Sequence, residues 1–140
     1  MPASPAPQSP RLALPLAFEA FCILRREPYL AYAQAHLGAA AGADAVAEAF
    51  GDLVTHWSTI VASHNPAAGA WEHFTQWIAA RSCPLPIWAE CTLQYQVVVL
   101  HDLADCSLAV TAEATGQDPS QIRYFLHRWR RATSTEPSPL

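Results

Sequence analysis

The stretch at residues 107–131, SLAVTAEATGQDPSQIRYFLHRWRR, decides the fold predicted for this chain. Ser107 is a suitable N-cap for a short helix that extends to Thr115. Gly116 follows directly, and glycine is the residue that most easily adopts the left-handed conformation in which many helices end. The first part of the stretch therefore predicts a short helix that ends in a tight turn.

A second helix is predicted to begin directly after this turn. Asp118 is a favourable N-cap, Pro119 suits the first helical position, and Gln121 completes a capping-box pattern. Apolar residues then recur at intervals of three and four along one face of the helix, namely Ile122, Phe125, Leu126 and Trp129. Together, the two helices and their turn predict a helix-turn-helix.

The opposite face of the second helix is basic and rich in hydrogen-bonding groups. It consists of Ser120, Gln121, Arg123, Tyr124, His127, Arg128, Arg130 and Arg131. Such a face is typical of a recognition helix, whose first turn lies near base edges in the major groove and whose arginines contact phosphates. We therefore predict that these residues bind double-stranded DNA. The alternative is an amphipathic terminal helix whose arginines are merely solvated.

The composition of the chain indicates a helical protein in which DNA binding is local. Its 140 residues, 51% of them apolar, suffice for one domain or two very small ones. Residues 1–118 contain four arginines and eleven acidic residues, a balance of −7, whereas residues 119–140 contain four arginines and one acidic residue, a balance of +3. Since the whole chain has a net charge of −4, its overall attraction to nucleic acid is weak.

The spacing of cysteines and histidines predicts no metal site, cofactor or catalytic centre. The cysteines show no C-x-x-C interval, and the six histidines do not accompany them at ligand intervals. We therefore expect buried free thiols at Cys22, Cys83, Cys91 and Cys106. No nucleophile, acid pair or phosphate loop accompanies the histidines, so an enzyme receives little support.

The two ends of the chain are predicted to be tails. The first residues, MPASPAPQSP, are too rich in proline for a signal peptide, and no apolar run reaches the length of a membrane span. We expect a disordered tail at residues 1–14, a second tail at residues 135–140, and a cytoplasmic protein that contacts no membrane.

Five further helices are predicted between the first tail and residue 107. A first helix must end or reset at Pro28, because proline lacks the N–H donor and clashes with the preceding turn. Its core side is formed by Phe18, Phe21, Cys22 and Leu24. The next helices extend over residues 28–37, 43–60, 66–82 and 87–103, and Asn65 caps the one at 66–82. No strand pattern with alternating polarity is present, so the predicted fold class is all-α.

Two of these helices have a distinctive face. The helix at 43–60 has an acidic stripe at Asp44, Glu48 and Asp52, whose like charges repel each other unless a basic partner meets them. The helix at 66–82 has an apolar stripe at Trp71, Phe74, Trp77 and Ile78. This second stripe indicates a core face, or alternatively a platform on which single-stranded bases stack. A core face is favoured because only Arg81 supplies positive charge beside it.

The order of these segments resembles that of the extracytoplasmic-function sigma factors, the two-domain bacterial proteins that bring RNA polymerase to promoters. The segments similar to the family's region two are FEAF at 18–21, YA at 32–33, HLG at 36–38, GADAVAEAF at 42–50 and FTQWI at 74–78. The segments similar to its region four are YQVVVLHDL at 95–103, AEATG at 112–116 and Ile122 with LHR at 126–128. The resemblance extends over roughly residues 16–132, and its strength is the shared order.

The resemblance implies two domains and three functional surfaces. A region-two-like helical bundle would occupy residues 15–83, and a region-four-like helix-turn-helix would occupy residues 88–134. In the family, the acidic helix docks on the RNA polymerase core, which here would involve Asp44, Glu48 and Asp52. The family's aromatic helix and the loop before it capture unpaired promoter bases, and residues 63–81 occupy that place. The last helix of the family reads the upstream promoter element in the major groove.

The chain departs from the family's pattern in its linker and in two helices. Pro84 stops the aromatic helix before a basic end, and Val110 replaces a carboxylate at the first helix of the helix-turn-helix. Only six residues, 83–88, separate the halves, and these extend over at most about 20 Å. Promoter elements roughly 17 base pairs apart lie about 58 Å from each other. We therefore predict that the halves pack together and do not reach both elements.

The sequence thus predicts an all-α, sigma-factor-like regulator of bacterial transcription that binds DNA, RNA polymerase core or another regulator. The alternative is a degenerate relative that has lost promoter recognition and serves as a protein-interaction module, including as a dimer with itself.

Overall fold

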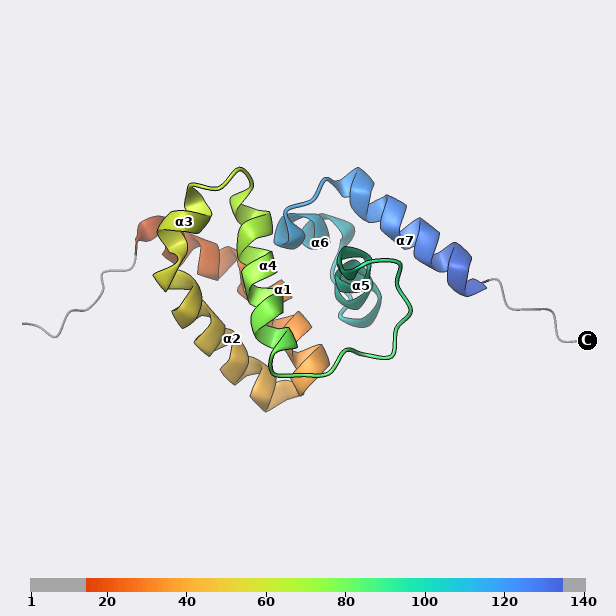
Figure 1. Cartoon of the computed structure of the whole chain (residues 1–140), viewed down its shortest axis with the longest axis horizontal. Coiled ribbons are helices and arrows are strands. Elements are labelled where there is room, and N and C mark those ends of the chain that lie inside the picture. Colours follow the sequence, from red (N-terminus) through yellow and green to blue (C-terminus); the bar gives the residue numbers. More distant parts are fainter. Residues whose placement is uncertain (1–14, 135–140) are drawn as a thin grey trace, which may run out of the picture.

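The computed structural model describes residues 15–134, which form an all-α fold (Figure 1). The two predicted tails, residues 1–14 and 135–140, lie outside the described residues. The helices are α1 (Leu16–Leu37), α2 (Ala39–Thr55), α3 (Trp57–Val61), α4 (Pro66–Ala79), α5 (Thr92–Val98), α6 (Leu108–Thr115) and α7 (Pro119–Ser134), and a π-helical segment, η1 (Val99–Leu103), continues α5. Within the described residues, every helix is too short or too polar to cross a bilayer.

Pro28 does not end the first helix, contrary to the prediction. Helix α1 continues without a break from Leu16 to Leu37, and Pro28 lies buried in its interior. The missing N–H of Pro28 leaves the carbonyl of Leu24 without its helical partner. Leu24 is 67% exposed, so water can form a hydrogen bond with that carbonyl. The prediction that Leu24 lies on the core side of the helix is therefore wrong as well. Burial of Pro28 and the following Tyr29 against the neighbouring helices offsets the cost of the proline.

Two other helix boundaries differ from those predicted. The helix expected at 43–60 is divided at His56 into α2 and α3, where the Thr55 hydroxyl donates a hydrogen bond to the carbonyl of Asp52 at 2.6 Å. Such a side-chain bond competes with the backbone N–H groups for the carbonyl oxygen, and so interrupts the helical hydrogen-bond pattern. Helix α5 begins at Thr92 rather than at residue 87, because Cys91 has an extended backbone and caps it. The connection between α4 and α5 is therefore residues 80–91, twice as long as the predicted linker.

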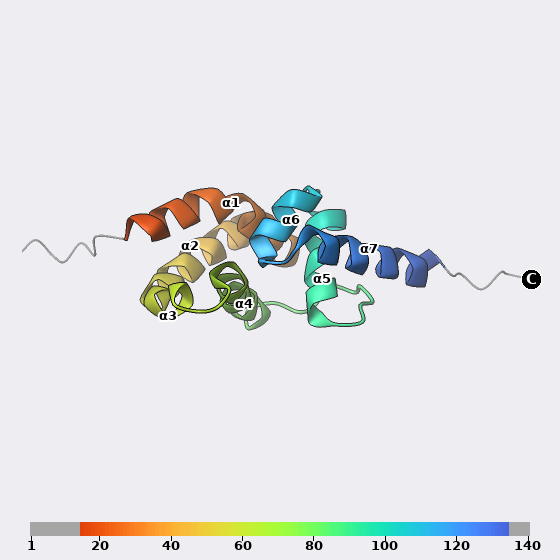
Figure 2. The same ribbon diagram turned by 90° about the horizontal axis from the view of Figure 1, so that it is seen from above.

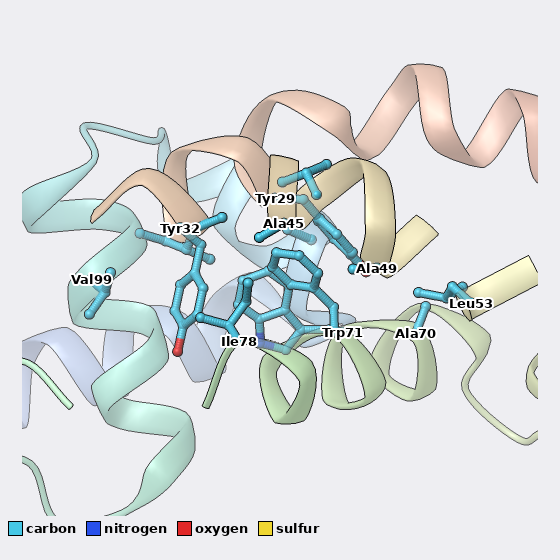
Figure 3. Packing of buried hydrophobic residues seen from close by; sticks show 14 of the residues in the cluster. Tyr29, Tyr32, Ala45, Ala49, Leu53, Ala70, Trp71, Ile78 and Val99 are labelled. Atoms are coloured by element: carbon cyan, nitrogen blue, oxygen red, sulfur yellow. The ribbon is translucent and has the colours of Figure 1, made fainter. Parts of the chain in front are cut away.

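The main core lies between α1, α2 and α4, and aromatic rings fill its centre (Figure 3). The ring of Tyr29 lies 4.3 Å from that of Phe74 and 5.2 Å from that of Trp71, measured between centroids. Trp71, Phe74 and Ile78 are at most 2% exposed. The prediction that the stripe on the fourth helix faces a core is thus confirmed for these three residues. The rings of Trp71 and Phe74 are therefore not available to stack on bases.

The second half of the chain packs on the first half through the same core. Val99 and Leu100 of η1 and Ala114 of α6 belong to the cluster that contains the residues of α1, α2 and α4. A buried hydrogen bond of 2.8 Å also joins the Trp71 indole N–H to the side-chain oxygen of Gln96 in α5. Parts of both predicted segments therefore form one core, whereas Ile122 and Leu126 of α7 belong to a second cluster with Val97 and Val98. Helices α3 and α7 lie at opposite ends of the long axis (Figures 1 and 2).

The four cysteines differ in exposure, which corrects the prediction of four buried thiols. Cys22 and Cys106 are partly buried, and burial raises the pKa of both thiols. Cys83 and Cys91 are exposed because they lie in the connection between α4 and α5.

Candidate nucleic-acid interface

The helices α6 and α7 and the turn between them lie at the residues predicted for the helix-turn-helix. The Ser107 hydroxyl accepts a hydrogen bond from the N–H of Val110 at 3.0 Å and so caps α6. Gly116 ends that helix in the left-handed conformation, with φ 70° and ψ 25°. Its position is also sterically restricted, because a Cβ atom there would lie 2.4 Å from the backbone nitrogen of Ala68 in α4.

The turn is attached to the beginning of α4 as well. The side chain of Asn65 caps α4 by accepting a hydrogen bond from Ala68, as predicted, and its amide donates to the carbonyl of Gly116 at 2.8 Å. One side chain thus orders the start of α4 and fixes the turn before α7.

The start of α7 is stabilised by Asp118. Its carboxylate accepts hydrogen bonds from the Ser120 hydroxyl at 2.7 Å and from the Ser120 N–H at 2.9 Å. These two bonds, and to a smaller extent the charge of Arg123, hold the pKa of Asp118 below its ordinary value. The carboxylate therefore stays ionised and complements the positive end of the α7 dipole.

Helix α7 has the two faces that its sequence predicts. Ile122 and Leu126 are at most 2% exposed, and Phe125 and Trp129 are partly buried beside them. All eight residues of the predicted DNA-binding face are exposed: Ser120, Gln121, Arg123, Tyr124, His127, Arg128, Arg130 and Arg131. The helix projects at the end of the molecule (Figure 2), so this face is open to solvent.

Gln94 of α5 holds α7 in place, a role that the sequence analysis missed. The side chain is fully buried, and its amide nitrogen donates to the carbonyl of Phe125 at 3.1 Å. Its oxygen accepts from the N–H of Glu90 at 2.5 Å. The Trp129 indole N–H also donates to the carbonyl of Trp88 at 2.9 Å. The glutamines Gln94 and Gln96 among the apolar residues of α5 were the available signal.

Arg128 and Arg130 of the α7 face form ion pairs with other described residues. Arg128 binds both carboxylate oxygens of Glu90, with the shortest N–O distance at 2.6 Å, and these hydrogen bonds raise the pKa of the guanidinium. Arg130 lies 3.4 Å from Asp102. Arg123 forms no ion pair within residues 15–134. The acidic side chains would therefore compete with DNA phosphates for two of the arginines.

The acidic stripe is divided between solvent and interior contacts. Asp44 and Glu48 are exposed on α2, whereas Asp52 is partly buried and its carboxylate lies 2.5 Å from Nε2 of His73 on α4. Helix α2 is well separated from α7 in the view of Figure 1. The exposed acidic residues and the basic face could therefore contact two different partners simultaneously.

Little aromatic surface remains in residues 63–81 for contact with unpaired bases. Trp77 of the stripe is partly exposed. The guanidinium of Arg81 lies 3.5 Å from the centre of the Trp77 ring. Arg81 also donates to the carbonyl of Trp77 at 2.9 Å. The cation and the ring are therefore already engaged with each other.

A pocket of about 510 Å³ lies between α1, α4 and α5. Its His36 has both ring nitrogens in hydrogen bonds, one to the carbonyl of Tyr32 at 2.9 Å and one to the hydroxyl of Tyr95 at 2.7 Å. Since a carbonyl only accepts, Nδ1 carries the proton and the Tyr95 hydroxyl donates to Nε2. His36 thus joins α1 to α5 across the wall of the pocket.

Comparisons with models of protein families, with curated proteins and with solved structures found no match to this chain.

Proposed function

We propose that this protein is a sigma-factor-like transcription regulator that binds double-stranded DNA through α7 and RNA polymerase core through α2. The observation that supports this proposal best is the face of α7, on which all eight polar and basic residues are exposed above a buried apolar seam. A helix held from behind in this way presents its first turn to a groove without movement of the helix itself.

DNA binding would use the two ends of α7 differently. Ser120, Gln121 and Arg123 in the first turns are exposed and would lie nearest the base edges. Arg128 and Arg130 would leave Glu90 and Asp102 and bind phosphates instead. This exchange costs little, because water screens exposed ion pairs and leaves them little net stabilisation. The same acidic residues lower the local positive potential and so weaken non-specific binding.

Polymerase docking would rely on the exposed part of the acidic stripe. Asp44 and Glu48 are free of the contacts that engage Asp52, and α2 presents them on its solvent side. Capture of unpaired bases by Trp71 and Phe74 is not part of the proposal, because both rings lie in the core. The proposed protein therefore binds duplex DNA and the polymerase without melting the promoter through these rings.

The salt dependence of DNA binding tests the proposal. Replacing Arg123 and Arg128 by glutamine should weaken binding to random-sequence duplex DNA in fluorescence anisotropy. The slope of log K against log salt should fall by about two units, close to one for each lost phosphate contact. The matched control removes two exposed arginines outside α7, Arg26 and Arg81, and should leave the slope unchanged. Equal slopes for wild type and the α7 variant would refute DNA reading by this face.

A protein-interaction module is the second candidate, and the exposed side of α1 favours it. Leu16 is 82% exposed, Ile23 79% and Leu24 67%, and their spacing places them on one side of the helix. Neighbouring apolar residues on a surface are typical of a contact site. If this candidate is correct, the protein should sediment as a dimer that Ile23→Glu with Leu24→Glu converts to a monomer, and it should not bind duplex DNA.

A further inference from the structure

Three potential metal ligands meet at the end of α2. Asp52 lies in the last turn of this helix, His56 directly follows it, and His73 extends from α4. One ligand atom from each of the three lies within 4.8 Å of the other two. The Asp52 carboxylate is 2.5 Å from Nε2 of His73 and 3.9 Å from Nδ1 of His56, and the two imidazole rings lie 4.8 Å apart.

These distances suit one small divalent cation. Zinc binds imidazole nitrogens and carboxylate oxygens at about 2.0–2.2 Å, so two ligand atoms of a tetrahedral site lie about 3.3 Å from each other. The distances of Asp52 to the two histidines bracket this value. Changes of about an ångström in these distances would therefore bring the three ligand atoms to positions around one ion. Rotation of the side chains can supply changes of that size.

The scaffold allows that rotation at one residue and restrains it at the other two. The His56 side chain is 54% exposed, and its hydrogen bonds reach only Asp52 and Thr55 in its own turn. It can reorient without disturbing the core. Asp52 and His73 are 32% and 27% exposed, and they extend from helices that pack against each other. A cation can enter from solvent and meet two ligands already in place.

We propose that Asp52, His56 and His73 bind one divalent transition-metal ion of the zinc type, with water in the fourth position. Two imidazoles and one carboxylate favour zinc and its neighbours over magnesium and calcium, which prefer oxygen ligands. The bound ion joins the end of α2 to α4 at the point where α2 gives way to α3. The site does not depend on the proposed function, since α7 contributes no residue to it.

Sequence spacing alone does not reveal this site, because its ligands come from two segments that lie far apart in the chain. Asp52 and His56 are four residues apart and share a helix face. His73 is 17 residues further along, and only the packing of α4 against α2 brings it to them. The expectation of no metal rested on cysteine–histidine spacings, whereas the cysteines take no part here.

Titration of the metal-stripped full-length chain with Zn²⁺ tests the proposal. Calorimetry should show one ion bound per chain, and His56→Gln and His73→Gln should each weaken the affinity by at least about tenfold. The matched control is His64→Gln, which alters an exposed histidine outside the cluster and should bind as wild type. His56→Gln changes a largely exposed side chain, so it keeps the test valid if His73→Gln fails to fold.

A second measurement separates this site from binding by cysteine. Titration with Co²⁺ should give weak visible absorption without the intense near-ultraviolet band of a cobalt–thiolate bond. Replacing Cys83 and Cys91, the exposed thiols, by serine should leave Zn²⁺ affinity unchanged. The proposal is overturned if no ion binds, if both histidine variants bind as wild type, or if the serine variant loses binding.

Discussion

Gly116→Ala should destabilise the protein by separating the turn before α7 from the start of α4. Gly116 has φ 70°, and a non-glycine residue in that left-handed conformation costs about 1–2 kcal/mol. The new Cβ atom would also lie 2.4 Å from the nitrogen and 2.8 Å from the Cα of Ala68. Both neighbours are backbone atoms, so no side-chain rotation relieves the overlap.

The expected magnitude follows from the contacts that must break. To make room, the turn has to move away from α4 and lose the hydrogen bond between Asn65 and the Gly116 carbonyl. A net loss of about 0.5–1.5 kcal/mol for this bond, added to the conformational cost, gives a destabilisation of about 1.5–3.5 kcal/mol. That is a large part of the total stability of a small domain.

Urea denaturation followed by far-ultraviolet circular dichroism measures this cost, and two other glycines serve as controls. Gly38 has φ 90° and open space around its Cα, so Gly38→Ala should show backbone strain without a clash. Gly51 lies in α2 with open space, and Gly51→Ala should stabilise the protein by about 0.5–1 kcal/mol. A Gly116→Ala variant as stable as wild type would refute the close contact between the turn and α4.

Three further changes test other contacts. Asp44→Arg with Glu48→Arg should abolish capture of polymerase core in a pull-down while the helical circular-dichroism signal persists; retained capture would exclude docking through α2. Gln94→Leu should cost about 1–3 kcal/mol in urea denaturation, because the Phe125 carbonyl and the Glu90 N–H lose a buried partner; an unchanged midpoint would contradict that role. The pKa of Asp118 is lower in the folded state, so its stabilising contribution is complete above about pH 3.9, the unfolded value, and disappears as the pH falls through the folded value. The stability difference between wild type and Asp118→Asn should follow this course, and a difference independent of pH would count against the ionised cap.

Local signals in the sequence determined the parts of the fold that depend on a few neighbouring residues. Ser107, Gly116 and Pro119 mark the bounds of α6 and α7, because caps, left-handed glycines and N-terminal prolines act within one turn of the backbone. The apolar periodicity of Ile122 and Leu126 likewise assigned the two faces of α7, since a single helix fixes which side chains share a face.

Tertiary packing decided what local signals could not. Pro28 is a helix breaker in isolation, yet α1 continues through it because Pro28 and the following Tyr29 are buried against other helices. The halves lie together through a shared core and the Trp71–Gln96 hydrogen bond, and not because the linker is short. Asp52 contacts His73, which lies 21 positions further along the chain. Arg128 forms its ion pair with Glu90, which lies 38 positions before it. Such pairings depend on how helices pack, and helix packing is set by side chains from the whole chain at once.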